Sequence, residues 1–201
     1  MTNSAQALNK AIFLDRDGVI NPDHGYIKSP AEISPYPYAA QAIKIFNELG
    51  YKVIVVSNQS GIARGYFSLA DLENIHAHLL SALAEGGAKI DKIYFAPYHI
   101  DGKVKPYNVQ HQDRKPDIGM FKKACNDFDL DPSISYMIGD RLSDMIFAKN
   151  ARLSPILVLS GDGKADFRKR LKDFPQYQPL FIAQDILAAA LLIKNIDNGF
   201  K

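Results

Sequence analysis

Two aspartates lie two positions apart directly after the first apolar run of the chain. The run at 11–14 reads Ala-Ile-Phe-Leu, and Asp15, Arg16, Asp17 and Gly18 follow it. Carboxylates this close repel each other, and burial beside an apolar run adds a desolvation penalty. Because Asp and Gly are also common turn formers, the motif alone fits either a structural turn or a site that does chemistry.

Polar residues at the ends of other predicted elements favour a catalytic site over a structural turn. Ser57 closes the apolar run at 52–57, Lys115 precedes a helical segment, and Asp140 closes the run at 134–140. A carboxylate that attacks a phosphate dianion needs Mg²⁺ held by oxygen ligands, and a hydroxyl and a cation on the phosphate oxygens. A hydroxyl, a lysine and a third acid near the first two acids therefore predict phosphoryl transfer through an aspartyl phosphate.

The two first aspartates then have different roles. Asp15 is the expected nucleophile, which forms a phospho-enzyme intermediate. Asp17 is expected to protonate the leaving alcohol and then to activate the hydrolytic water, while its backbone carbonyl helps to hold the metal. Gly18 lets the chain turn sharply. Asp144, one helical turn beyond Asp140, either supports the metal site or caps the helix on which it lies.

Apolar runs and segments of helical periodicity alternate along the chain. Strands are predicted at 11–15, 52–57, 92–97, 134–140 and 155–160. Helices are predicted at 38–49, 69–85, 117–127 and 142–151, with two more in ADFRKRLKDF and AQDILAAALLI between about 165 and 195. This alternation predicts an α/β fold: a Rossmann-like parallel sheet with helices on both faces and a ligand site outside the carboxyl ends of the strands.

Composition limits the class of protein. The 201 residues are 47% hydrophobic, which suits one domain over residues 1–201. The net charge of +2 gives no reason to expect binding to nucleic acid or to a membrane. A single cysteine excludes an intramolecular disulfide, and neither the polar start MTNSAQALNK nor any later run is apolar enough for a signal peptide or a spanning helix. We expect a monomeric cytoplasmic protein with a small-molecule partner.

Three other residues of reactive type are interpreted as structural. Cys125 has no neighbouring His in the sequence and is expected to be a small buried hydrophobe. His76 and His78 lie two residues apart on the helix predicted at 69–85. Side chains at this spacing point in different directions, so these histidines are expected to be core or surface residues rather than ligands.

Four motifs resemble those of one enzyme family. FLDRDGVIN, VVSNQSGIARG, RKPDIGM and MIGDRLSDM occur between residues 11 and 160, in the order found in the haloacid dehalogenase (HAD) superfamily of phosphatases. The resemblance is strongest to the D-glycero-D-manno-heptose 1,7-bisphosphate 7-phosphatases, and DHGY at 23–26 is similar too. It implies a Mg²⁺-dependent phosphatase acting on the 7-phosphate of that sugar. Histidinol phosphate or another small phosphomonoester is the alternative substrate, because histidinol-phosphate phosphatases are near relatives.

The same resemblance implies roles for individual residues. It makes Asp15 the nucleophile and Asp17 the acid and base, and it adds Asp140 to both of them in the Mg²⁺ site. Substrate contacts are implied for Ser57, Asn58, Arg64, Arg114 and Lys115. Of these, Ser57 and Lys115 are expected to hold the transferring phosphate.

Substrate selection depends on loops, because no segment of about 100 residues remains for a large cap domain. The segments 20–36 and 98–114 are expected to cover the site. A bisphosphorylated sugar needs a second anionic subsite, for which Arg64, Arg114 and Arg141 offer forked donors. Two other classes stay open: a phosphorylatable receiver, disfavoured because its phosphorylated Asp follows a later strand, and a non-catalytic binding module, disfavoured because no expected catalytic position is substituted.

The segment 98–114 departs from the relatives that the chain resembles. Many of them bind a structural Zn²⁺ there through a Cys-x-His and a Cys-x-Cys pair. The matching positions here are Ala96, Tyr98, His111 and Asp113. His99, His111 and Asp113 offer at most three ligands, whereas a structural zinc site normally has four. We expect Mg²⁺ but no structural Zn²⁺, and a segment stiffened by prolines and packed by Tyr98 and Tyr107.

Overall fold

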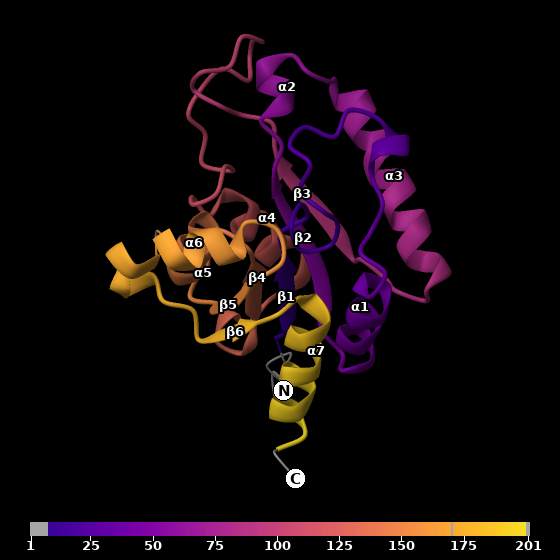
Figure 1. Ribbon diagram of the computed structural model, residues 1–201, viewed down its shortest axis with the longest axis vertical. Helices are drawn as coiled ribbons and strands as arrows, with labels where there is room; N and C mark the ends of the chain where they lie inside the picture. Colours follow the sequence, from indigo (N-terminus) through magenta and orange to yellow (C-terminus); the bar gives the residue numbers. More distant parts are fainter. Residues whose placement is uncertain (1–7, 170, 200–201) are drawn as a thin grey trace, which may run out of the picture.

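Six parallel strands form the centre of the protein (Figure 1). The computed structural model describes residues 8–169 and 171–199. The strands are β1 (Ala11–Leu14), β2 (Lys52–Asn58), β3 (Lys92–Ala96), β4 (Tyr136–Gly139), β5 (Ser154–Val158) and β6 (Phe181–Ala183). They pair in the order β3-β2-β1-β4-β5-β6. The strand order changes direction between β1 and β4, which is where a sheet of this kind binds its ligand.

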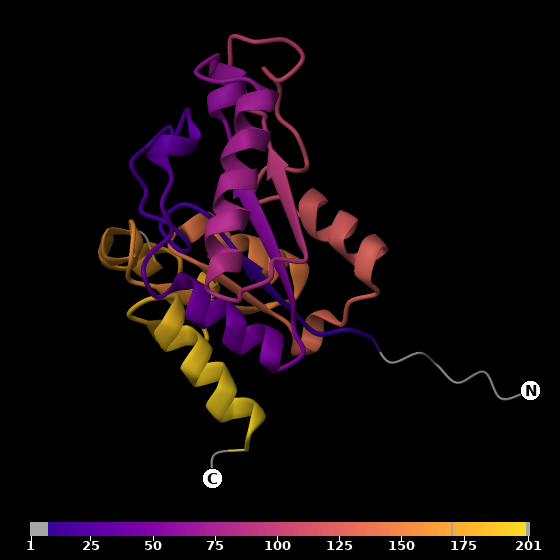
Figure 2. The ribbon, with the colours of Figure 1, turned by 90° about the vertical axis from the view of Figure 1, so that its right-hand side faces the viewer.

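Helices cover both faces of this sheet. They are α1 (Ala39–Glu48), α2 (Gly61–Arg64), α3 (Leu69–Glu85), α4 (Gly119–Phe128), α5 (Leu142–Ala151), α6 (Gly163–Lys169) and α7 (Ile186–Asp197). Short 3-10 turns lie at Pro30–Glu32, Pro132–Ile134, Leu171–Asp173 and Pro175–Tyr177. Figure 2 shows α1 and α7 on one face and α4 on the other. The predicted α/β fold class is confirmed.

Alternate residues of β1 supply the two halves of the core. Ile12 and Leu14 pack on the side of α1 and α7, whereas Phe13 packs on the side of α4 and α5. The ring of Phe13 lies 5.6 Å from that of Phe121 and 6.4 Å from that of Phe147. Because both faces of the strand are buried, its sequence is an unbroken apolar run. This packing anchors the chain immediately before the first two aspartates.

Most elements lie where the sequence predicts them, and the helices at 69–85 and 142–151 match to the residue. The sequence does not predict α2 or β6. The latter is a three-residue edge strand in the short apolar run 180–183, with Ile182 45% exposed, and Ala183 at the end of this run belongs to the helix predicted after it. The helix predicted from 183 begins at Ile186 instead, because Asp185 accepts a hydrogen bond from the N–H of Ala188 and caps it. Cys125 is half-buried rather than fully buried.

Loops gather at the carboxyl ends of the strands. The segment between β3 and α4, residues 97–118, is called the long loop below, and it lies with α2 at the top of Figure 1. The turn Pro30–Glu32 packs against α3 on the other side of this end. No described helix is long and apolar enough to cross a membrane. Residues 1–7, which belong to the polar start of the sequence, lie outside the described residues, so the expectation about a signal peptide stays a prediction.

Candidate active site

Asp15 follows β1 in the middle of the sheet. Its N–H donates to the carbonyl of Ile138 at 3.0 Å, which continues the pairing with β4. One carboxylate oxygen accepts from the N–H of Arg16 at 2.7 Å, and the other lies 3.0 Å from Nζ of Lys115. The residue is 8% exposed and lines a cavity. A carboxylate held this firmly, with one edge open to a cavity, suits an attacking nucleophile.

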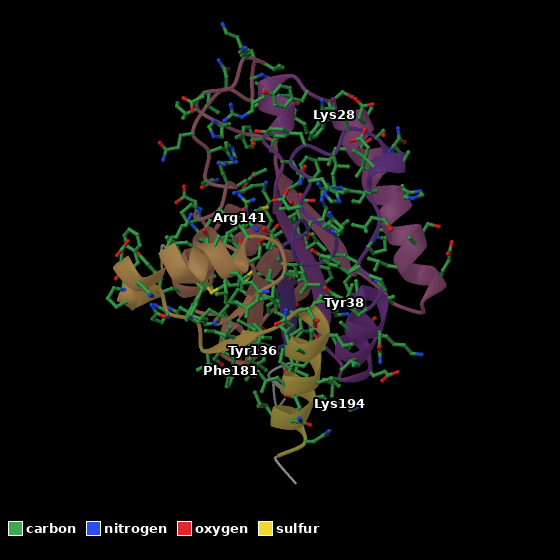
Figure 3. All side chains as sticks on the ribbon, viewed as in Figure 1. Lys28, Tyr38, Tyr136, Arg141, Phe181 and Lys194 are labelled. Carbon is green, nitrogen blue, oxygen red and sulfur yellow. The ribbon has the colours of Figure 1, made fainter. Side chains whose placement is uncertain are left out.

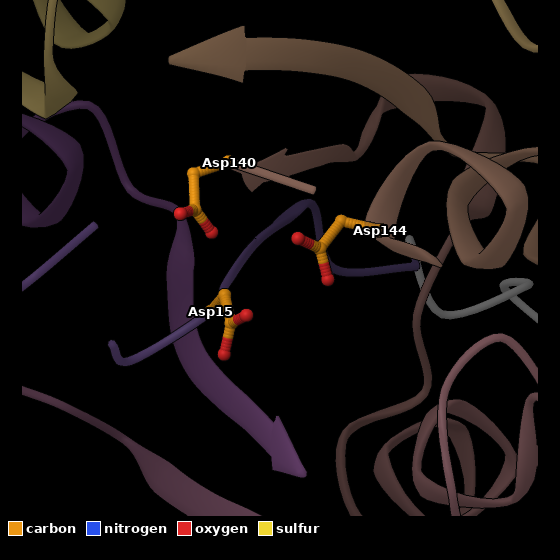
Figure 4. Close-up of side chains that lie close together, drawn as sticks. All are labelled: Asp15, Asp140 and Asp144. Carbon is orange, nitrogen blue, oxygen red and sulfur yellow. The ribbon is translucent and has the colours of Figure 1, made fainter. Parts of the chain in front are cut away.

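Asp140 and Asp144 join Asp15 in a group of buried carboxylates, called the acid cluster below (Figure 4). One oxygen from each lies within 4.8 Å of the others, and the cluster is the only such group of three acids, histidines or cysteines in the described residues. Asp140 and Asp144 are fully buried. Oδ1 of Asp140 has no hydrogen-bond partner in the described part of the chain. A buried anionic oxygen without a donor fits a bound cation.

Glycines leave the space that Asp140 needs. Gly18 has φ +85°, and a Cβ on it would lie 2.3 Å from Oδ2 of Asp140. A Cβ on Gly161 would lie equally close to the same oxygen. That oxygen accepts from the N–H of Asp162 at 2.8 Å, so the backbone fixes the carboxylate and Oδ1 remains for a cation. Clustered carboxylate oxygens are the donors that Mg²⁺ prefers, so the residues fit this ion.

Burial gives the acid cluster unusual titration behaviour. It raises the pKa of Asp15 to about 7, assisted by repulsion from Asp144 and Asp17 and opposed by Lys115. Burial, with repulsion from Asp15 and Asp144, also raises the pKa of Asp140 to about 8. The one lysine in contact does not neutralise three acids, whereas a divalent cation would favour their ionised forms. The electrostatics therefore agree with a magnesium site.

Lys115 connects the expected nucleophile to the rest of the acid cluster. Its buried Nζ lies 3.0 Å from Asp15 and 2.8 Å from Oδ1 of Asp144. Burial acts to lower the pKa of Lys115, but Asp144 and Asp15 raise it above its ordinary value, so the amine stays charged. Asn58 donates to the carbonyl of Lys115 at 3.0 Å and accepts from its N–H at 2.9 Å. Asn58, expected to contact substrate, thus also fixes the backbone of this lysine.

Asp144 combines the two roles that its spacing left open. Its Oδ2 accepts from the backbone N–H of Arg141 at 3.0 Å, which caps α5. Its Oδ1 pairs with Lys115 in the acid cluster. A Cβ on Gly139 would lie 2.3 Å from Cβ of Asp144, so only glycine allows this approach. The capping contact holds the carboxylate in the acid cluster.

Asp17 receives four hydrogen bonds on its two oxygens. Oδ1 accepts from Nε of Arg16 at 3.0 Å and from Asn21 at 2.9 Å. Oδ2 accepts from Nη2 of Arg16 at 2.7 Å and from Gln59 at 3.1 Å. Gln59 also donates to Oγ of Ser57 at 2.8 Å, and these two residues line the same cavity as Asp17. The expected acid and the expected phosphate-binding hydroxyl are therefore neighbours, and Gln59, which the sequence did not single out, links them.

A cavity of about 360 Å³ opens above these groups. It is lined by Asp15, Asp17, Asp23, Gly25, Tyr26, Ser57, Asn58, Gln59, Ser60, Gly61, Arg114, Lys115, Arg141 and Ser143. Arg141, which is labelled in Figure 3, is one of these residues. Its Nη2 is 2.5 Å from Asp23 and 2.9 Å from Asp162. Because two carboxylates already neutralise Arg141, it is less suited to a second phosphate than its sequence position suggests.

Arg64 and Arg114 form a cationic pair beside the cavity. Arg114 lines it, whereas Arg64 does not. Burial and then Arg64 lower the pKa of Arg114. Nη2 of Arg64 lies 3.2 Å from Nε2 of His99, and its Nε is buried without a hydrogen-bond partner in the described residues. Neither arginine has an ion pair with an acid in the described part of the chain, so the pair can accept an anion.

The long loop is packed by aromatic rings, as the sequence predicts. The Tyr98 ring lies 5.9 Å from that of Tyr107 and stacks on His111 at 3.8 Å. Asp113 pairs with Lys123 on α4 at 2.6 Å. Three of the residues that we weighed as zinc ligands therefore have other contacts: His99, His111 and Asp113. The expectation that the loop binds no Zn²⁺ stays a prediction.

Comparisons with known proteins agree with the geometry. The model of the HAD-hydrolase-like family matches residues 112–189. The chain is 34% identical over 190 residues to D-glycero-beta-D-manno-heptose-1,7-bisphosphate 7-phosphatase of Pasteurella multocida, which covers 94% of this chain and 99% of that protein. It is 40% identical over 185 residues to D-glycero-D-manno-heptose-1,7-bisphosphate 7-phosphatase of Thermosynechococcus vestitus, which covers 89% and 92%.

A solved crystal structure of a related phosphatase also matches nearly the whole chain. The crystal structure of D,D-heptose 1,7-bisphosphate phosphatase from B. bronchiseptica, complexed with magnesium and phosphate, matches with a TM-score of 0.82 at 32% identity. The match covers 93% of this chain and 99% of that one. The similarity therefore extends over the whole fold and not only over the four motifs.

Proposed function

The chain belongs to the family of HAD-like phosphatases that contains the D-glycero-D-manno-heptose-1,7-bisphosphate 7-phosphatases, and on this premise we propose that it hydrolyses the 7-phosphate of D-glycero-D-manno-heptose 1,7-bisphosphate. It is a phosphoric monoester hydrolase with Mg²⁺ as its cofactor. The relatives that the chain matches over nearly their full length are named as enzymes. The comparisons therefore do not support a receiver or a non-catalytic binding module.

One observation carries the proposal: a cavity has the acid cluster and Lys115 at one end and in its wall Arg114, which has no ion pair with an acid in the described residues. The first end suits phosphoryl transfer to Asp15. The arginine, with Arg64 behind it, suits a second phosphate on the same substrate. A monophosphate would leave these two cations without an anionic partner.

The proposed reaction has two steps. Oδ2 or Oδ1 of Asp15 attacks the phosphorus, the bond from phosphorus to the sugar oxygen breaks, and Asp17 gives that oxygen a proton. Water then attacks the aspartyl phosphate, Asp17 takes a proton from it, and inorganic phosphate leaves with Asp15 restored. Ser57 and Lys115 hold the phosphate oxygens in both steps. Asp15, Asp140 and the carbonyl of Asp17 would hold Mg²⁺, which would supply the charge that offsets repulsion between carboxylate and phosphate.

The experiment is phosphate release from a panel of substrates with Mg²⁺ present, with the remaining sugar phosphate identified by phosphorus NMR. We expect the highest kcat/KM for the 1,7-bisphosphate and loss of the 7-phosphate alone. Faster hydrolysis of histidinol phosphate would favour the alternative substrate. No hydrolysis of any phosphomonoester would contradict the proposal as a whole.

Several broader expectations accompany this proposal. We infer one domain over residues 1–201, because β1 to β6 share a single sheet in the described residues. The monomeric state and the cytoplasmic location expected from the sequence stay predictions. Size-exclusion chromatography with light scattering tests the first, and cell fractionation tests the second.

A further inference from the structure

Arg16 lies between the two catalytic aspartates in the sequence but contacts only the second with its side chain. It is 1% exposed, the largest of the side chains that are fully buried in the described residues. Its guanidinium holds Asp17 through Nε and Nη2 at 3.0 and 2.7 Å, one contact to each carboxylate oxygen. A forked contact of this kind fixes the plane of a carboxylate as well as its position.

The other end of the guanidinium is held by His76 on α3. Nη1 of Arg16 lies 3.3 Å from Nε2 of His76. Arginine has only donors, so Nε2 of the imidazole must accept in this contact. His76 is 7% exposed, and its ring lies 5.8 Å from that of Phe95 on β3. A helix and a strand distant in sequence therefore fix a side chain that the nucleophile loop supplies.

The four donors on Asp17 differ in their access to substrate. Arg16 and Asn21 are almost fully buried and do not line the cavity. Gln59 does line it, and its contact with Oδ2 is the longest of the four at 3.1 Å. An ionised carboxylate has about four acceptor positions, and all of them are in use. One donor must therefore leave before Asp17 exchanges a proton with substrate, and Gln59 is the donor that substrate can reach.

We propose that Arg16 and His76 are positioning residues: His76 fixes Arg16, and Arg16 fixes Asp17 so that proton transfer to the leaving sugar oxygen runs through Oδ2. The proposal rests on the proposed function, because it takes Asp17 as the general acid. It assigns a role to a buried histidine on α3 that neither the acid cluster nor the cavity lining uses. A proton donor displaced by a fraction of an ångström loses much of its effect, which makes this support measurable.

Leaving-group dependence provides the test. A sugar alkoxide needs a proton as it leaves, whereas p-nitrophenolate leaves without one. We would measure single-turnover phosphorylation with heptose 1,7-bisphosphate and with p-nitrophenyl phosphate for His76→Phe and for Arg16→Lys, which cannot make the forked contact. We expect the rate with the sugar phosphate to fall about tenfold to a hundredfold. The rate with the aryl phosphate should fall less than about threefold, with KM nearly unchanged.

Two further variants separate positioning from a general packing effect. His76→Gln retains an acceptor and should recover most of the rate that His76→Phe loses. His78→Phe, on the exposed side of the same helix, should behave as the unchanged protein. Equal losses on both substrates, or a His76→Gln variant as slow as His76→Phe with the same unfolding temperature, would overturn the proposal.

Asp17→Asn, measured alongside, distinguishes this failure from that of the proposed function. If Asp17→Asn discriminates between the two substrates and His76→Phe does not, only the positioning role is wrong. If Asp17→Asn treats both substrates alike, Asp17 is not the general acid, and the positioning proposal is overturned together with that part of the proposed function.

Discussion

The acid cluster and the long loop meet in one cavity but are held by different forces. The acid cluster is fixed by backbone turns, glycines that admit close approach, and a buried lysine. The outer part of the long loop is fixed by stacked rings and leaves Ile100 66% and Val109 40% exposed. Buried charges tolerate little change, because removing one partner leaves the others uncompensated. The outer loop tolerates more, since its contacts are partly in water.

This difference matches the two expected tasks: the acid cluster for phosphoryl transfer and the long loop for recognition of the substrate. Asp15 and Asp140 follow the ends of the two central strands and Asp144 lies in the first turn of α5, so their geometry depends on the sheet and on the helix that leaves it. Arg114 and Lys115 are adjacent in sequence and both line the cavity, but only Lys115 contacts the acid cluster. Asn58 makes two hydrogen bonds to the backbone of Lys115 and so holds this lysine in place beside the acid cluster. The long loop can therefore change in its outer part without moving the lysine.

The largest effect should come from the acid cluster itself. Asp15→Asn keeps the shape of the side chain but removes the attacking charge, so we expect kcat to fall at least about 10⁴-fold. The circular dichroism spectrum should be unchanged. Steady-state phosphate release measures the rate, and a variant within tenfold of the original kcat would show that Asp15 is not the nucleophile.

A second change tests whether close approach matters more than backbone conformation. Gly18→Ala places a Cβ 2.3 Å from Asp140, whereas Gly25→Ala, at nearly the same φ, meets nothing within 4 Å. Both carry the strain of a positive φ, so their difference measures the clash. We expect kcat to fall about a hundredfold more for Gly18→Ala, with a higher Mg²⁺ requirement. Similar losses in both variants would assign the effect to strain.

The long loop should affect affinity rather than rate. Arg114→Ala removes a charged donor from the cavity wall, so we expect KM for the bisphosphate to rise about tenfold to a hundredfold. With p-nitrophenyl phosphate, which has no second phosphate, kcat/KM should change little. Lys103→Ala, an exposed cation on the same loop, is the control. A large loss of kcat with both substrates would place Arg114 in the chemical step instead.

The acid cluster also predicts how stability depends on pH. The pKa values of Asp15 and Asp140 are raised to about 7 and 8, so the folded state binds more protons than the unfolded state. The stability contribution is present at low pH and is lost as the pH rises through these values. In EDTA, urea denaturation should show the free energy of unfolding falling by about 4 kcal/mol between pH 6 and 9, with little further change above the folded pKa values. Added Mg²⁺ should remove the fall, and Asp140→Asn should reduce it.

The smallest expected effect concerns zinc in the long loop. Untagged protein purified without added metal should contain well below one zinc ion per chain by mass spectrometry. A strong chelator followed by Mg²⁺ should restore full activity. Zinc close to one ion per chain that disappears in His111→Ala would show that a metal, rather than the stacking of Tyr98 on His111, holds this loop.

The sequence predicts the layered fold because its signals are local. The apolar runs at β1, β2 and β5 and the periodicity of α3 and α5 depend only on residues that are neighbours in the chain. The short edge strand β6 gives a weaker signal, because its apolar run at 180–183 is short, continues directly into a segment of helical periodicity and pairs only with β5. The four motifs likewise identify the family, since each is a continuous segment at the end of a predicted element.

What the sequence alone determined is the inventory of the site: two aspartates after the first strand, a third after the fourth, a hydroxyl and a lysine. Only the tertiary structure decided which partners each one has. In the folded protein Arg16 contacts Asp17 and His76. Arg141 pairs with Asp23 and Asp162. Asn58 forms hydrogen bonds with the backbone of Lys115. The physical reason is distance along the chain: hydrogen bonds and ion pairs between remote segments depend on how helices and loops pack across the sheet, which spacing within a motif does not encode.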